Sequence, residues 1–283
     1  MKSYLFFMFL LFFTQVKAQV RTSQFVNRTD LLENYCYSLH FPISYTCDTC
    51  TYANCDTCAS YLSDLSKFVD LQVENVSRKD VDDLLKMLPQ LTEVRTIQFR
   101  CIPGRYVQIF QEIEKLDKLE YVEFQGYVFS DADLDNIDFS FILSKLKKIK
   151  YLSIISFNLS VIPPEIGQLT QLRQLNIADN DFAEFPKEFA NLHNLKILRV
   201  GVLARFDKKF TSKVQHISET ILGLPNLEDL TIISPDLREI PCGLMDMPKL
   251  KRVAIRQNKY ITEKPDCIDE NKFDYFYVYT SSY

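Results

Sequence analysis

Five of the eight cysteines lie close together near the N-terminus, and four of them form two CxxC pairs: Cys47 with Cys50, and Cys55 with Cys58. Four thiolates can hold a tetrahedral zinc ion, a CxxC pair can exchange with disulfides, and an exported chain can oxidise such cysteines to structural disulfides. Paired zinc knuckles usually have about 15 to 20 residues between the pairs, whereas four separate them here. The spacing favours disulfides, with zinc binding and redox exchange as alternatives.

A second chemically capable group is the acidic run at residues 131 to 138, whose alternating aspartates resemble the start of a calcium-binding loop. The pattern then stops. Asn136 stands where the loop needs glycine, and Ile142 stands where it needs a bidentate glutamate. We therefore expect an acidic, solvated start to the helix that follows, and no metal site.

Motifs of catalysis are missing from the sequence. It contains no HExxH, no GxSxG, no phosphate-binding glycine loop and no dinucleotide fingerprint. Its three histidines, His40, His193 and His216, fall in three separate predicted segments. The sequence predicts a protein that is not an enzyme and needs no cofactor.

An apolar repeat predicts the strands and turns that must position any functional residues. An apolar residue is followed by further apolar residues at offsets three, six and eight, and the central copies are 23 residues apart. The nine start positions are Leu65, Leu91, Leu116, Leu146, Leu169, Leu192, Leu224, Met247 and Glu270. A self-similar period of this size predicts a solenoid, with the last copy as a capping coil.

The rest of each coil differs with its length. In the short coils, Pro163, Pro186 and Pro241 mark a compact turn, and Ile166, Phe189 and Leu244 are expected to fill the convex side. In two longer coils, helical spacing predicts helices over residues 77 to 88, with Ser77 in a capping box, and over residues 208 to 224.

The coil LTQLRQLNIADNDFAEFP, residues 169 to 186, closely resembles the leucine-rich repeat pattern. Its Phe-Pro turn and the Ile-Pro turns resemble the Ras-group and plant disease-resistance type, well over residues 146 to 200 and 224 to 265 and weakly before. The resemblance implies an α/β horseshoe, with a parallel sheet on the concave face, helices and short turns on the convex face, and protein binding. Asn180 and Asn258 fill the family's asparagine position, whereas Phe157 and Pro235 stand there in other coils.

Function in such a solenoid is expected on the concave face. Residues at offsets five, seven and nine of each coil point outward there, because side chains alternate along a strand. Nine strands about 4.8 Å apart span roughly 38 Å, which suits a protein or peptide better than a small molecule. Aromatic and arginine side chains are typical of interface hot spots. The candidate binding residues are Tyr121, Tyr151, Ile155, Ile197, Arg199, Arg252, Arg256, Tyr275 and Tyr277.

The same register makes a prediction about Cys242 and Cys267. They occupy equivalent turns of adjacent coils, so stacking should bring them together as a disulfide. Cys36 and Cys101 are left to pair with each other or to exchange with the N-terminal cluster. Three sequons, at Asn27, Asn75 and Asn158, are candidate glycosylation sites.

The N-terminus looks like a secretory signal peptide covering residues 1 to 18. Its apolar run is ten residues long, whereas a membrane span needs about 20. We divide the chain into this signal, a Cys-rich cap at 19–64 and the repeat domain at 65–283. Removing the signal would lower the net charge from −4 to −6, which disfavours nucleic acid and anionic membranes as partners.

Three functions are compatible with these features. The first is a secreted module, or in a bacterium a periplasmic or surface module, that recognises a protein or peptide through its concave face. The alternative is a structural or adhesive cell-surface component. The third is a thiol-disulfide oxidoreductase that uses the two CxxC pairs.

Overall fold

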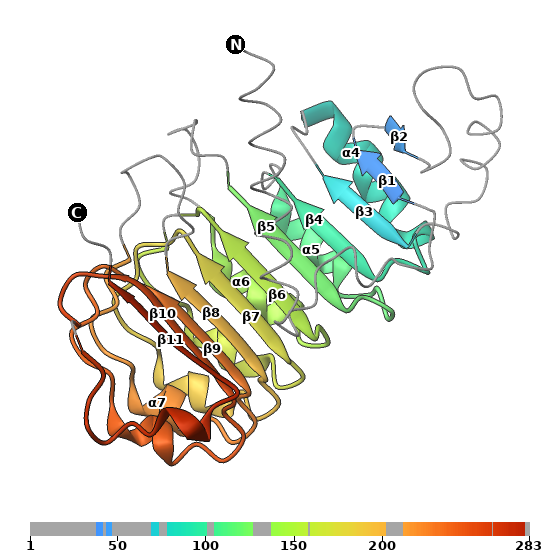
Figure 1. The fold of residues 1–283 in the computed structure, drawn as a ribbon. Helices are drawn as coiled ribbons and strands as arrows, with labels where there is room; N and C mark the ends of the chain where they lie inside the picture. The colour runs from blue at the N-terminus through green and yellow to red at the C-terminus, as the bar shows by residue number, and fades with distance from the viewer. Residues whose placement is uncertain are drawn as a thin grey trace, which may run out of the picture.

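The computed structural model describes residues 38–41, 44–46, 69–73, 78–100, 105–126, 137–157, 159–201, 212–261 and 263–280. Figure 1 shows one long, curved sheet whose strands lie side by side, with helices and turns on its outer side. Among the described residues, none of the helices has the length and hydrophobicity needed to cross a lipid bilayer.

Eleven strands form this sheet in the order β11-β10-β9-β8-β7-β6-β5-β4-β3-β1-β2, and all neighbours from β3 to β11 are parallel. Each of these nine strands begins five residues after one of the nine predicted starts, which confirms the repeat register. They are β3 Asp70–Val73, β4 Thr96–Phe99, β5 Tyr121–Gln125, β6 Tyr151–Ile155, β7 Gln174–Ala178, β8 Ile197–Gly201, β9 Asp229–Ile233, β10 Arg252–Asn258 and β11 Tyr275–Thr280.

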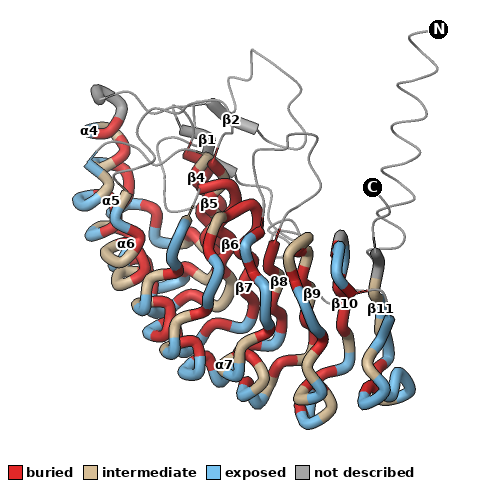
Figure 2. Tube along the Cα trace, turned by 90° about the vertical axis from the view of Figure 1, so that its left-hand side faces the viewer, coloured by how far each residue is buried: buried red, intermediate tan, exposed pale blue. Residues whose placement is uncertain are grey.

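Equal offsets align across the strands, and this alignment builds the core. Leu152 pairs with Leu175, which pairs with Leu198, and all three side chains are fully buried. Every further coil adds one more apolar layer to the same column, so the core is continuous along the solenoid (Figure 2). The solenoid thus has one core, and each coil relies on its neighbours to bury it.

The sheet also extends into the segment that we assigned to the N-terminal cap. Strand β1, Ser38–Phe41, pairs in parallel with β3, and β2, Ser44–Thr46, pairs with β1 in the antiparallel direction. The apolar register did not predict either strand, because its first start is Leu65.

The convex side follows coil length as expected in most coils. The longer coils carry α4 Arg78–Met87, continued by η2 Leu88–Gln90, then α5 Tyr106–Ile113 and α6 Phe139–Lys145. The proline-marked coils carry the 3-10 helices η4 Pro164–Gln168, η5 Lys187–Asn191 and η6 Cys242–Met245, and the last coil carries η7 Glu270–Lys272. As predicted, Ile166, Phe189 and Leu244 fill these turns and are fully buried.

The helix expected over residues 208 to 224 is wrong for most of its length. Residues 208 to 211 lie outside the described residues, and within the described part of this range only α7, Glu219–Leu222, is helical. The Gln215 carbonyl accepts a hydrogen bond from the Arg238 amide of the next coil, at 2.9 Å. Ile217, Ile221 and Leu224 repeat the spacing of Ile162, Ile166 and Leu169, so the apolar pattern that suggested a long helix belongs to a short convex turn.

The two repeat-pattern asparagines each tie neighbouring coils together. Asn180 donates to the carbonyls of Ile154 and Ala178, both at 2.9 Å, and accepts from the amides of Phe157 and Leu159, both at 3.2 Å. Asn258 is likewise buried and makes four bonds, to the carbonyls of Ser234 and Leu237 and from the amides of Tyr260 and Ile261. In the coil that starts at Leu224, the buried Ser234 hydroxyl donates to the Val214 carbonyl at 2.7 Å.

Candidate binding surface on the concave face

Three of the nine candidate residues are not available on the surface. The side chains of Tyr121, Ile155 and Ile197 are buried, with exposed fractions of 4%, 8% and 6%. Tyr121 shows why: its ring packs 6.4 Å from that of Tyr151, and its hydroxyl donates to Glu123 at 2.6 Å. The concave curvature brings outward side chains of neighbouring strands together, so outward position alone does not mean exposure.

The outward side chains of β3 to β7 hydrogen-bond to one another across the strands. The Thr96 hydroxyl donates to the carboxylate of Asp70, and both side chains are buried. The side-chain amide of Gln98 donates to the Glu123 carboxylate at 2.8 Å. Further along, the Asn176 amide donates to the Ser153 hydroxyl at 3.1 Å. These groups stabilise the sheet and leave little polar surface for a partner.

The outward side chains of β8 to β11 form a different surface, which we call the C-terminal patch. It contains Arg199, Asp229, Thr231, Arg252, Ala254, Arg256, Tyr275 and Tyr277. The strand register places Asp229, Arg252 and Tyr275 in one row, and Arg199, Thr231, Ala254 and Tyr277 in the next. Tyr275 and Tyr277 are 37% and 39% exposed, and Arg256 is exposed as well.

Arginine and tyrosine side chains are paired within the patch. The Arg252 guanidinium lies 5.4 Å from the Tyr275 ring centre, and the Arg256 guanidinium lies 5.9 Å from that of Tyr277. The two tyrosine rings stack with their centres 6.0 Å apart. Such cation–π contacts restrict the arginine rotamers before any partner arrives.

Charge in the patch is unbalanced. Arg252 Nε lies 3.3 Å from a carboxylate oxygen of Asp229, whose side chain is only 7% exposed. Burial raises the pKa of Asp229, although Arg199 and Arg252 oppose the rise. Burial also lowers the pKa of Arg199 to about 10; Asp229 opposes this, while Arg256 and Arg252 add repulsion. Three guanidinium groups therefore share the region with one carboxylate.

The three predicted arginines differ in how far they are available to a partner. Arg199 is largely enclosed and Arg252 is bonded to Asp229, so these two contribute to the structure of the sheet as well as to its surface. Arg256 is the exposed one. Asp229 was not among the predicted binding residues, although its place opposite Arg252 in the repeat register could have identified it.

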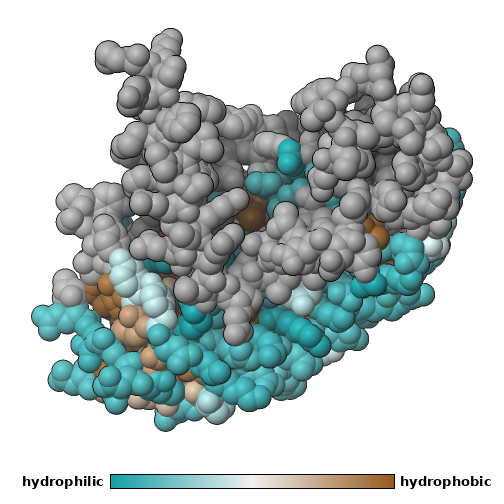
Figure 3. Space-filling view, turned by 45° about the vertical axis from the view of Figure 1, so that its right-hand side comes forward, coloured by the Kyte–Doolittle hydropathy of each residue, from teal (hydrophilic) through white to brown (hydrophobic). Residues whose placement is uncertain are grey.

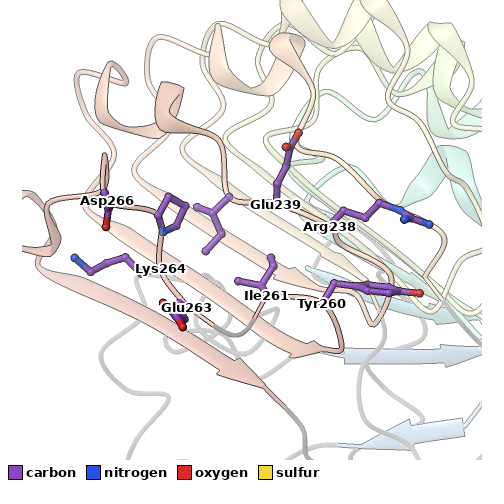
Figure 4. Close-up of a pocket in the computed structure, with 9 residues that line it drawn as sticks. Arg238, Glu239, Tyr260, Ile261, Glu263, Lys264 and Asp266 are labelled. Atoms are coloured by element: carbon purple, nitrogen blue, oxygen red, sulfur yellow. The ribbon is translucent and has the colours of Figure 1, made fainter.

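A pocket of about 460 Å³ lies away from this face, among the loops that follow β9 and β10 (Figure 4). Arg238 and Tyr260 lie at one end, with the guanidinium 5.2 Å from the ring centre, and Lys264 and Asp266 lie at the other end. Its charged side chains are of both signs and largely exposed. Their mixture favours no ligand class.

The end coil is fastened in two ways. Cys242 and Cys267 form the disulfide that the register predicted, with their Cα atoms 5.7 Å apart. Lys272 Nζ donates to the carbonyls of Leu244, Met245 and Met247, at 2.9, 2.6 and 3.0 Å. Cys267 lies just before η7, Lys272 ends η7, and β11 follows, so both links hold the last part of the C-terminal patch in place.

The other candidate residues lie outside the described residues: Cys36, Cys47, Cys50, Cys55, Cys58, Cys101, Asn27, Asn75 and Asn158. Most of the acidic run at 131 to 138 does too. Its last member, Asp138, caps α6 by accepting a hydrogen bond from the Phe141 amide at 3.0 Å, as the helix-start interpretation expected. Within the described ranges, no cluster of His, Cys, Asp and Glu is arranged to hold a metal ion.

Comparisons with known proteins complete the description. No protein-family model matches the chain. An adenylate cyclase of Schizosaccharomyces pombe is 23% identical over 161 residues, which are 49% of this chain and 10% of the cyclase. A probable inactive serine/threonine-protein kinase of Dictyostelium discoideum, roco10, is 31% identical over 127 residues, which are 44% of this chain and 4% of the kinase. The chain thus spans a tenth or less of these curated relatives.

Among solved structures, a leucine-rich repeat protein of Leptospira interrogans superposes with a TM-score of 0.52 at 20% identity. The match covers 80% of this chain and 57% of the other. Identity at this level shows the fold alone, and the Ras-group subtype stays a prediction. The register of nine coils, the parallel strands β3 to β11 and this likeness together show that the chain folds as a leucine-rich repeat solenoid.

Proposed function

We propose that this chain is an exported leucine-rich repeat module that binds a protein or peptide at the C-terminal patch of its concave face. The observation that carries the proposal is the pair of exposed tyrosines, Tyr275 and Tyr277, each with an arginine guanidinium against its ring. Tyrosine and arginine are enriched at interface hot spots, and rotamers restricted in advance reduce the entropy cost of binding.

The surface elsewhere supports the same location. Figure 3 shows that most of the described surface in that view is hydrophilic, with one apolar area near its left-hand end and smaller apolar spots among the grey segments. The polar groups of β3 to β7 are engaged with one another, whereas β10 and β11 present rings and guanidinium groups to solvent. A partner that needs both apolar contact and charge would find them together at this end.

Export is part of the proposal. It is supported by the short apolar run at residues 4 to 13 and by the disulfide between Cys242 and Cys267, which are both exposed. Exposed disulfides persist in oxidising compartments and are rare in the cytosol. The intact mass of the protein recovered from the medium should correspond to a chain that begins at Gln19. A mass that retains residues 1 to 18 would contradict cleavage.

Binding is tested by site-specific photo-crosslinking in concentrated extracellular fluid. A photoreactive phenylalanine analogue replaces Tyr275, and the matched control carries it at Val161, which is 68% exposed and lies in the loop after β6. We expect one defined adduct from position 275, removed by an excess of unlabelled wild-type protein. The control should give no competed adduct.

Equal crosslinking from both positions would instead favour the structural or adhesive alternative, in which contacts are spread over the molecule. Absence of a competed adduct at position 275 would overturn the proposed site. The oxidoreductase hypothesis is tested separately by insulin reduction, since activity lost on changing Cys47, Cys50, Cys55 or Cys58 to serine would revive it.

A further inference from the structure

The strand register arranges three arginines around small side chains at the centre of the C-terminal patch. Thr231 and Ala254 lie between Arg199 on one side and Tyr277 on the other. Arg252 and Arg256 stand on β10 before and after Ala254, roughly 13 Å apart at the usual strand rise. Short side chains thus lie in the middle of this part of the sheet, and positively charged side chains lie around them.

The row that contains Arg256 is unbalanced in charge. It consists of Gly201, Ile233, Arg256 and Tyr279, so none of its residues is acidic. The glycine is required there, because its φ is 110° and an added Cβ would lie 1.8 Å from the Ile233 carbonyl oxygen. Gly201, which lies on β8 two strands away from Arg256, therefore contributes no side chain to this row.

Among the outward positions of β8 to β11, at offsets five, seven and nine, Asp229 is the single carboxylate, and Arg252 already contacts it. Burial, together with repulsion from Arg256 and Arg252, lowers the pKa of Arg199. The charged form of Arg199 is therefore less stable here than in water. A second negative charge, supplied from outside, would relieve this repulsion and complete the pairing of Arg256.

We infer that the ligand of the C-terminal patch is an acidic peptide segment, whose carboxylate is held by Arg256 with support from Arg199 and Arg252. This inference rests on the proposed function and names its ligand class. The aliphatic part of an acidic side chain would lie against Tyr275 and Tyr277, whose exposed rings provide the apolar contact.

The charge distribution along the concave face favours a peptide over a nucleic acid. Glu123 lies half-buried on the outward side of β5, and the whole chain carries a net charge of −4. A long uniform polyanion that followed the concave face would meet this carboxylate and be repelled. A peptide can be acidic at one end and neutral or basic at the other.

The test measures fluorescence anisotropy of a fluorescein-labelled peptide of alternating glutamate and alanine, titrated with the mature, disulfide-intact protein. A labelled peptide of alternating glutamine and alanine is the uncharged control, and a labelled single-stranded oligothymidylate tests binding of nucleic acid. We expect saturable binding of the glutamate peptide that weakens with added salt, and much weaker binding of both other probes.

Arg256→Gln should weaken binding of the glutamate peptide by about tenfold, the loss of one charge-assisted hydrogen bond. Arg238→Gln is the matched control, since Arg238 is also exposed and lies over a tyrosine ring, but outside the concave face. It should leave the affinity unchanged. Circular dichroism should show both variants folded.

Three results would overturn the inference: no saturable binding, binding that Arg256→Gln leaves unchanged, or preference for the oligothymidylate. Failure here is distinguishable from failure of the proposed function. If the crosslinked adduct at position 275 forms while the glutamate peptide does not bind, the site is correct and the ligand class is wrong.

Discussion

In β3 to β7 the outward side chains bond to one another across the strands, whereas in β10 and β11 they form arginine–tyrosine pairs that reach the solvent. Both regions share one backbone register and one core. Asp70 is bonded to the Thr96 hydroxyl and is fully buried, while Arg256 lies exposed over Tyr277. The difference shows that outward residues in such a solenoid divide between holding neighbouring strands together and meeting a partner.

The largest expected effect on stability tests whether buried asparagines stabilise the β3 to β7 region and the C-terminal region equally. Asn180→Ala in one region and Asn258→Ala in the other each remove four hydrogen bonds to backbone groups, three of them buried and one part-buried in each case. Each should lower the free energy of unfolding by about 3 kcal/mol or more, because the groups left behind lose their partners. Urea denaturation measures both. A loss below about 1 kcal/mol at either position would contradict an equal supporting role.

The next effect should be confined to the C-terminal region. Replacing both Cys242 and Cys267 by serine opens the disulfide and should cost about 3 kcal/mol. Hydrogen exchange should show lost protection first in β11 and β10, since end coils of a solenoid contact only one neighbour. Equal loss of protection in β3 and β4 would show that the disulfide acts on the whole chain instead.

A smaller loss of stability is expected from replacing either of two threonines whose hydroxyls donate to an aspartate. Thr96→Val removes a buried hydrogen bond to Asp70 and should cost about 2 kcal/mol. Thr231→Val removes a longer bond, 3.4 Å, to Asp229 on the half-exposed C-terminal patch and should cost about 0.5 kcal/mol. Thermal unfolding of the two variants is the measurement. A larger loss from Thr231→Val would reverse the comparison between the regions.

The smallest effect on stability is expected from Arg256→Gln. Its guanidinium is exposed, so the free energy of unfolding should change by no more than about 0.5 kcal/mol while peptide binding falls. Calorimetry and anisotropy on the same preparation separate the two properties. A destabilisation as large as that of Thr96→Val would mean that Arg256 also belongs to the supporting set.

Much of the fold followed from the spacing of apolar residues. The nine strand positions were predictable because a buried column tolerates only apolar side chains, and the same offsets placed Cys242 beside Cys267. The extent of the helix near residue 221 was not predictable, since spacings of three and four residues fit both a helix and a short convex turn.

The candidate site was predictable in position but less so in exposure. Offsets identified which residues point outward, but they contain no information about contacts between strands. Tyr121 was therefore expected to be available and is buried against Tyr151 and bonded to Glu123. The face to which a side chain points is set by its own strand, whereas the exposure of that side chain depends on the neighbouring strands.

Strand β11 has a consequence beyond recognition. It is the last strand in the sheet order, and its sequence, YFYVYT, contains no charge, no proline and no glycine. Six residues of this kind on a sheet edge have the composition of segments that stack into amyloid-like fibrils. The disulfide and the Lys272 carbonyl contacts keep this segment in register with β10, so that the folded end coil also serves to suppress aggregation.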